Sequence, residues 1–280
     1  MLNWFPGHMN SARREISQAM PKIDLVIEVL DARIPYSSTN PLVAEVRGEK
    51  PTIQILNKGD LADPDVTAQW LTHIDAREGV LALVHQQNQS KLNQRLLSRV
   101  RSQVTPKRNK PLAAMIVGIP NVGKSTLINA LSGRVIAKTG NKPAVTRHQQ
   151  RVKVGKHLVL WDTPGFLWPR LEPRECGYRL AVTGAITDRV VDPVQIGYFA
   201  AEAMVARYPD ALVETYRAET LDEGPEAILQ AVAKRRGCLR KGGVVDEERA
   251  AMALLRDLRN GTLGRISLET PSDWERAPDA

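Results

Sequence analysis

The stretch Gly118-Ile119-Pro120-Asn121-Val122-Gly123-Lys124-Ser125 decides the fold, because it matches the pattern GxxxxGK[ST]. An apolar run of strand length, residues 112–117, precedes it, and a helical pattern over residues 126–131 follows it. Glycines in such a loop let backbone N–H groups point at phosphates, and the helix N-terminus adds positive potential. Lys124 would contact the β and γ oxygens, and the Ser125 hydroxyl would ligate magnesium. The expected nucleotide contacts from this loop are Asn121, Val122, Gly123, Lys124, Ser125 and Thr126. A glycine-rich turn without function is the alternative, and the flanking elements disfavour it.

A second motif, Asp162-Thr163-Pro164-Gly165, follows an apolar strand expected over residues 158–161. A carboxylate at the carboxyl end of a parallel strand can face the magnesium of a nucleotide site. Asp162 would then hold the metal through water, and the Gly165 N–H would contact the γ-phosphate. Alone, this sequence is a plausible turn. Because it follows a phosphate loop in the same unit, the functional interpretation is favoured.

A third motif, Asn57-Lys58-Gly59-Asp60, follows an apolar run over residues 52–56 and fits NKxD, the pattern by which GTPases recognise guanine. The Asp60 carboxylate can accept hydrogen bonds from the ring N–H and the exocyclic amine, neither of which adenine offers. A buried hydrogen-bonding group of this kind can favour guanine over adenine by a factor of roughly 10⁴ or more. NKGD alone would be a surface turn. The three motifs together indicate a site for GTP or GDP with Mg²⁺, in which Asn57, Lys58 and Asp60 belong to the nucleotide-binding residues and Asp60 contacts the base.

The order of the motifs is unusual, since the guanine motif precedes the phosphate loop, whereas ordinary GTPases run the other way. Strand and helix patterns alternate through this part of the chain, which predicts a doubly wound, mainly parallel α/β sheet. We therefore expect a circularly permuted P-loop GTPase sheet. Permutation is tolerable because the termini of compact domains usually lie close together at the surface.

Strand signals fade beyond about residue 180, where helical patterns cover residues 194–208, 225–236 and 246–260. The sequence therefore predicts a permuted GTPase domain over residues 1–180 and a small all-helical domain over residues 181–280. The segment after Asp162 leads straight into that second domain, so nucleotide state could move it.

The composition is that of an ordinary globular protein, with 42% hydrophobic and 25% charged residues. The net charge of +8 is unevenly distributed: residues 1–190 sum to +12 and residues 191–280 to −4. Such a positive field predicts a polyanionic partner, such as nucleic acid. Two cysteines without a CxxC pair, and no apolar run of about 20 residues, favour a reducing, cytoplasmic location without a membrane span.

The motifs together resemble those of the bacterial ribosome biogenesis GTPase A family, also called YlqF-like, with mitochondrial relatives. Besides NKGD, GIPNVGKS and DTPG, the resemblance rests on Trp4–Met9 (WFPGHM), Asp31–Pro35 (DARIP), Leu180–Ile186 (LAVTGAI) and Lys234–Leu239 (KRRGCL). It runs nearly from end to end. The family implies GTP-driven maturation of the large ribosomal subunit by a permuted GTPase domain and a C-terminal helical domain that contacts rRNA.

The resemblance also implies roles for residues that no spacing identifies. Thr146 matches the threonine that closes on magnesium and the γ-phosphate, although Ala144 stands where the family more often has Gly. Phe166 follows Gly165, where many GTPases place a water-orienting glutamine, so hydrolysis by the protein alone should be slow. In families without that glutamine, His8 is the proposed catalytic substitute. Asn121 matches the ligand of an activating potassium ion.

These expectations describe a GTPase acting as an assembly factor. It would bind the immature large ribosomal subunit through rRNA and ribosomal proteins, promote a late maturation step and leave on hydrolysis, being monomeric when free. His8, Lys124 and Thr146 would take part in catalysis, and the particle and potassium would stimulate it. Two alternatives stay open: an RNA-binding scaffold with a structural nucleotide site, and a GTP-fuelled enzyme that acts on tRNA.

Overall fold

The computed structural model describes residues 8–86, 92–104, 110–133, 135, 150–168, 171–218 and 220–275. The chain divides into two compact units. The first comprises Met1–Leu171 and Glu269–Ala280, and the second is Glu172–Leu268.

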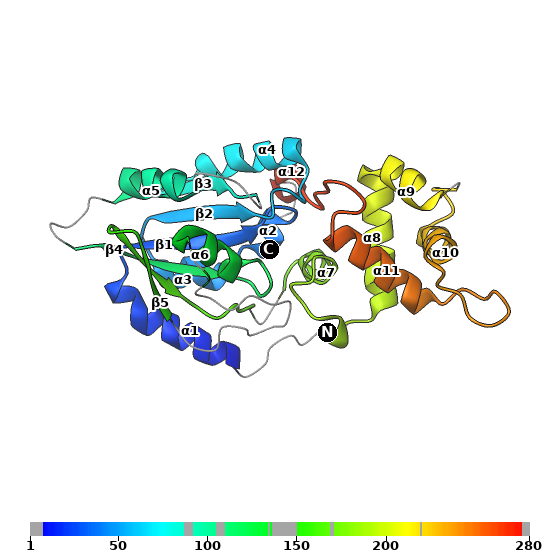
Figure 1. Ribbon diagram of the computed structural model, residues 1–280, viewed down its shortest axis with the longest axis horizontal. Helices are drawn as coiled ribbons and strands as arrows, with labels where there is room; N and C mark the ends of the chain where they lie inside the picture. Colours follow the sequence, from blue (N-terminus) through cyan, green and yellow to red (C-terminus); the bar gives the residue numbers. More distant parts are fainter. Residues whose placement is uncertain are drawn as a thin grey trace. The chain divides into compact units, whose positions relative to one another are not determined.

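The described part of the first unit contains a six-stranded sheet with the strand order β3-β2-β1-β4-β6-β5 (Figure 1). The strands are β1 (Leu25–Asp31), β2 (Thr52–Asn57), β3 (Val80–Val84), β4 (Leu112–Gly118), β5 (Gln150–Val154) and β6 (Leu158–Asp162). Neighbouring strands run parallel except β5, which is antiparallel to β6. Both β1 and β2 are buried along their whole length, as is typical of parallel strands covered on both faces. The carboxyl ends of the five parallel strands therefore lie along one edge of the sheet.

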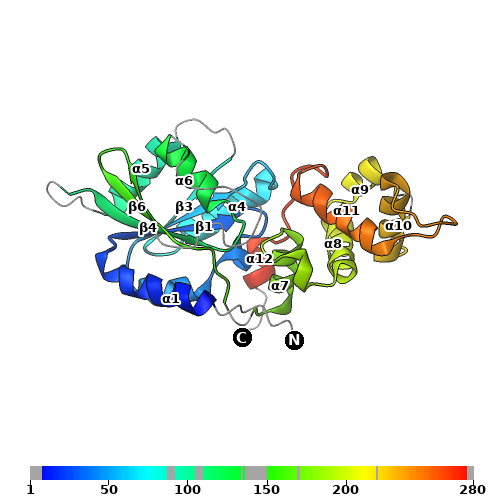
Figure 2. The same ribbon diagram turned by 60° about the horizontal axis from the view of Figure 1, so that its bottom comes forward.

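Helices cover both faces of this sheet, and Figure 2 shows α5 and α6 above it and α1 below it. The helices of this unit are α1 (His8–Ala19), followed by a 3-10 turn (Met20–Lys22), α2 (Pro35–Ser38), α3 (Pro41–Arg47), α4 (Pro64–Asp75), α5 (Leu92–Gln103), α6 (Lys124–Ser132) and α12 (Pro271–Glu275). Local sequence sets where they begin: the Asn40 side chain accepts from the Leu42 N–H before α3, and Asp63 caps α4. The predicted α/β doubly wound fold, with the guanine motif on a strand that precedes the phosphate-loop strand, is confirmed.

In its described residues the second unit consists of helices joined by loops, with one isolated β-bridge between Leu239 and Val245. Its helices are α7 (Arg174–Val182), a 3-10 turn (Asp188–Val190), α8 (Pro193–Arg207), α9 (Pro209–Tyr216), α10 (Pro225–Arg236) and α11 (Glu247–Arg259). Helix α11 packs on α8 and α10. The contact with α8 is close at Gly197, where an added Cβ would lie 2.6 Å from the Cβ of Ala251. Buried Asp257 joins the helices by accepting from the Tyr216 hydroxyl at 2.8 Å and from Arg236 Nε at 2.8 Å.

The division of the chain differs from the expected one in two places. The expected border after residue 180 falls inside α7, and the segment from Glu269 onward belongs to the first unit. The fading of strand patterns could locate neither point, because the chain is already irregular before α7 and the final segment is held by contacts with distant residues. No helix in the described ranges is long and apolar enough to cross a membrane.

Candidate nucleotide-binding site

The phosphate loop connects β4 to α6 and requires glycine at two positions. Gly118 has φ +153°, and an added Cβ would lie 2.5 Å from the Val29 carbonyl oxygen. Gly123 has φ +98° and precedes the first residue of α6, and an added Cβ there would lie 2.3 Å from Asn57 Nδ2. The positive end of the α6 dipole therefore faces the loop, an arrangement that suits phosphate groups.

Lys124 is buried at the start of α6, and its ammonium lies among the carbonyls of the loop. Its Nζ donates to Gly118 O and to Ile119 O, each at 2.9 Å. Burial lowers the pKa of Lys124 to about 8, and the negative charge of Asp162 partly offsets that effect. A buried cation of lowered pKa is stabilised when anionic oxygens approach it, which is the role expected of this lysine.

The second motif lies against the same loop. Gly165 is so close to it that an added Cβ would come within 2.9 Å of both Lys124 Nζ and Pro120 Cα. Asp162 ends β6 and is buried, and Thr163 Oγ1 fixes the following turn by donating to Ile116 O at 2.8 Å. The segment expected to contact the γ-phosphate therefore passes directly beside the phosphate loop.

The guanine motif meets the phosphate loop through Asn57, the last residue of β2. Asn57 Nδ2 donates to the Val122 carbonyl at 2.7 Å, and Asn57 Oδ1 lies 2.7 Å from His85 Nδ1. The predicted convergence of three distant motifs is thus present in the structure: NKGD and DTPG each contact the loop that contains Lys124. Asp60 lies three residues further along and is partly exposed.

His85 contributes to this site, although no motif identified it. It follows β3, and its carbonyl accepts from the Gly59 N–H at 3.0 Å while its ring contacts Asn57. Burial lowers the pKa of His85, Arg95 lowers it further and Asp60 opposes the shift. The lowered pKa favours the neutral ring, in which an Nδ1–H tautomer would donate to Asn57 Oδ1. The only sequence signal that could have indicated His85 is its position directly after the apolar run of β3, the strand next to β2.

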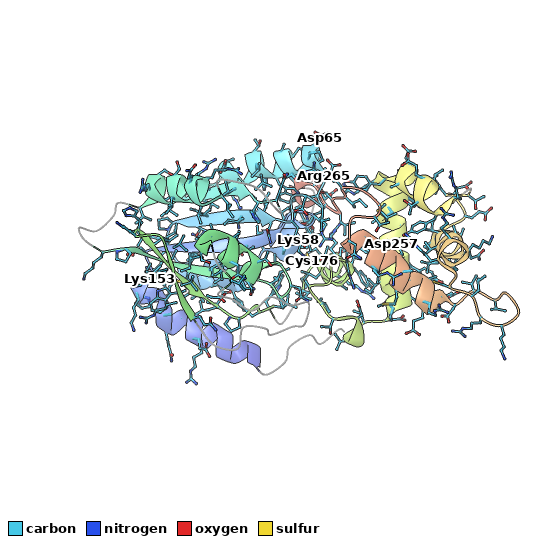
Figure 3. All side chains as sticks on the ribbon, viewed as in Figure 1. Lys58, Asp65, Lys153, Cys176, Asp257 and Arg265 are labelled. Carbon is cyan, nitrogen blue, oxygen red and sulfur yellow. The ribbon has the colours of Figure 1, made fainter. Side chains whose placement is uncertain are left out.

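Lys58 is held by the carboxylate of Asp31, which ends β1. Lys58 has φ +59°, and its Nζ lies 2.9 Å from Asp31 Oδ2 at the edge of the sheet where β1 and β2 finish (Figure 3). Asp31 also accepts from Arg33 Nε at 2.9 Å and from Arg33 Nη2 at 2.8 Å. Burial alone would raise the pKa of Asp31, but the charges of Arg33 and Lys58 hold it well below its ordinary value. The DARIP sequence, quoted above only for resemblance, thus fixes the guanine loop.

The residues at this edge suit a magnesium nucleotide. Ser125 in the first turn of α6 and Asp162 at the end of β6 offer oxygen atoms, the donors that Mg²⁺ prefers. Gly123 and Gly165 leave no side chain where the loop, Asn57 and Lys124 come together. Phe166, beside Gly165, is buried and apolar, and its carbonyl accepts from Asn40 Nδ2 at 3.3 Å.

Two of the expected site residues are not placed. Thr146 lies outside the described residues, and so does the side chain of His8, whose backbone begins α1. Their roles stay predictions.

Comparison with known proteins identifies the family of the chain. A family model described as a 50S ribosome-binding GTPase matches residues 113–211. The chain is 42% identical to ribosome biogenesis GTPase A of Priestia megaterium, over 98% of this chain and 99% of that protein. It is 32% identical to mitochondrial ribosome-associated GTPase 1 of Mus musculus, over 95% and 89% of the two chains. GNP-bound YlqF from T. maritima superposes with a TM-score of 0.68 at 26% identity, covering 93% of this chain and 98% of the other. The chain therefore belongs to the ribosome biogenesis GTPase A family of circularly permuted GTPases.

Proposed function

We propose that this protein is a GTP-hydrolysing assembly factor that binds the immature large ribosomal subunit, promotes a late maturation step and is released when GTP is hydrolysed. The observation that carries the proposal is the contact of NKGD and DTPG with one phosphate loop, through Asn57 Nδ2 on Val122 O and Gly165 against Lys124. The ribosomal part rests on the names of the relatives.

In this proposal different residues bind the guanine base and the phosphates. Asp60 accepts from the base, and Asn57 and Lys58 set the position of the loop that presents it. The backbone from Asn121 to Thr126 binds the phosphates, Lys124 contacts the β and γ oxygens, and the Gly165 N–H meets the γ-phosphate. Ser125, Asp162 and Thr146 would hold Mg²⁺, which when bound neutralises charge on the phosphate oxygens.

Catalysis by the protein alone should be slow. Phe166 occupies the place after Gly165 and has no group that could orient an attacking water by hydrogen bonding. We assign that role to His8, with Asn121 as a ligand for potassium, and expect the ribosomal particle to complete the arrangement. A GTPase completed by its own target hydrolyses GTP when the target is bound, which would time its release.

The charge distribution supports contact with rRNA. Residues 1–190 sum to +12, and such a positive field favours a polyanionic partner. Binding that depends on phosphate contacts should weaken steeply with added salt. We further expect the protein to work in the cytoplasm and to be monomeric when free.

The test has two parts. GTP turnover is measured with and without large-subunit precursors, in potassium and in sodium, and precursor binding is measured by pelleting with GTP, GDP or a non-hydrolysable analogue. We expect the particle and potassium to stimulate GTP turnover. We also expect the protein to stay bound to the particle when it carries the non-hydrolysable analogue. Equal turnover with and without the particle would contradict activation by it.

Matched variants separate the proposal from a scaffold role. Lys124→Ala removes the phosphate contact, while Lys153→Ala removes an exposed lysine of β5 at the other end of the sheet from Lys58 (Figure 3). The assembly-factor proposal expects the first variant alone to lose precursor maturation. If Lys124→Ala supports normal maturation, the nucleotide site is structural and the scaffold alternative holds.

A further inference from the structure

The segment that follows the helical unit returns to the nucleotide unit and ends in a buried carboxylate contact. Glu269 is fully buried, and its two carboxylate oxygens accept from the Ser37 N–H at 2.9 Å and from Ser37 Oγ at 2.5 Å. Its main-chain oxygen accepts from Trp70 Nε1 at 3.2 Å. A buried carboxylate is destabilised when it loses hydrogen-bond donors, and buried donors are destabilised when they lose their acceptor.

The rest of the segment covers the outside of α2 and α4. Trp274 stacks on Tyr36 with ring centroids 3.8 Å apart and planes 13° apart. It also packs against a core cluster that includes Leu30, Leu56 and Trp70, at the ends of β1 and β2 and on α4. Figure 1 shows α12, in red, beside α4 and near α2.

The helix that Glu269 holds is linked to the guanine loop through Asp31. Ser38 follows Ser37 in α2, and its Oγ accepts from the Asp31 N–H at 3.0 Å and donates to Ile34 O at 2.7 Å. Asp31 in turn holds Lys58 Nζ at 2.9 Å. Contacts therefore run without a break from Glu269 through α2 and Asp31 to Lys58.

Helix α2 cannot supply this order by itself. It has four residues, fewer than an isolated helix needs to be stable, so tertiary contacts must fix it. One of these contacts is the double hydrogen bond of Glu269 with Ser37, and hydrogen bonds to an ionised carboxylate are stronger than those between neutral groups.

We propose that Glu269 is a positioning residue for guanine recognition: it anchors α2, and thereby keeps Asp31 and Lys58 in the arrangement that presents Asp60 to the base. The inference rests on the proposed nucleotide site and adds a part of the chain that no motif assigns to it. Loss of the carboxylate charge loosens α2, so the guanine loop samples other positions and the base is read less well.

The experiment uses the full-length chain and three nucleotides: GDP, ADP, and inosine diphosphate, which lacks the exocyclic amine that Asp60 would contact. Dissociation constants are measured for the wild type and for Glu269→Gln, and urea unfolding reports stability separately. We expect Glu269→Gln to weaken GDP binding at least about fivefold, the low end of measured couplings between sites, and to reduce discrimination against inosine diphosphate. Asp246→Asn is the control, because Asp246 caps α11 in the helical unit, and its effect on GDP should stay below about twofold.

A double-mutant cycle with Lys58→Met tests the path. If Glu269 acts through Lys58, Glu269→Gln costs much less GDP affinity in the Lys58→Met background than in the wild type. Equal costs in the two backgrounds, or a folded Glu269→Gln variant with unchanged affinity and discrimination, would overturn the proposal. Should Glu269→Gln fail to fold, Trp274→Leu, which removes the stack on Tyr36, takes its place with the same expected and contrary results. If the wild type does not prefer GDP to ADP, the proposed nucleotide site itself is contradicted, rather than the role of Glu269.

Discussion

Nucleotide affinity should fall as the pH rises through about 8, because Lys124 must be charged to meet the phosphates. Burial lowers the pKa of Lys124 to about 8 in the protein without nucleotide. Phosphate oxygens favour the charged form, so the pKa rises again in the complex, and above pH 8 binding must take up a proton. About nine-tenths of Lys124 is protonated at pH 7 and about one-tenth at pH 9, so the dissociation constant for GDP should increase about tenfold.

The assay is a titration with a fluorescent GDP analogue at fixed ionic strength from pH 7 to pH 9. The guanine ring itself begins to lose a proton at the alkaline end, so a control must share that effect. Lys124→Arg does so, because a guanidinium stays charged over the whole range. Its absolute affinity is expected to be weaker, but its affinity should change less with pH. Equal slopes in the two proteins, or a wild type without a slope, would refute the assignment of the titration to Lys124.

Three further outcomes are expected. Asp60→Asn should weaken GDP and favour xanthosine diphosphate, changing the ratio of the two dissociation constants by at least about 100-fold; an unchanged ratio would mean that Asp60 does not read the base. Burial raises the pKa of Glu28 above 4.5, so its contribution to stability is full below that pH and is lost as the pH rises. The unfolding free energy of the wild type minus that of Glu28→Gln, from urea titrations, should therefore fall between pH 4.5 and pH 8, and a rise would contradict this. Asp257→Asn weakens the bonds to Tyr216 and Arg236 and should destabilise the helical unit by about 1–3 kcal/mol in thermal unfolding while leaving GDP affinity unchanged.

Much of the fold was predictable because its signals are local. Strands β1 and β2 read as short apolar runs since both of their faces are buried, and the order of NKGD and GIPNVGKS along the chain is enough to predict permutation. The return of Glu269 to the nucleotide unit was not predictable in this way. Its carboxylate is bonded to Ser37, 232 residues away, and no periodicity or turn pattern records a contact of that separation.

The site residues also differ in whether local sequence alone could predict them. Residues whose role depends on backbone shape and side-chain type within one loop, such as Gly123 and Lys124, followed from the motif alone. Asp31 and His85 did not, because Asp31 ends one neighbouring strand, His85 follows another, and each contacts NKGD from a different part of the chain. A single carboxylate or imidazole after an apolar run has many structural explanations, and only the distances to Lys58 and Asn57 select between them.

Because the nucleotide unit is made of chain from both sides of the helical unit, one cut cannot separate the two cleanly. A protein ended at Leu268 would lack Glu269 and Trp274, and a fragment stopping at Leu171 would be incomplete for the same reason. A stand-alone GTPase unit would need a linker that joins residue 171 to residue 269.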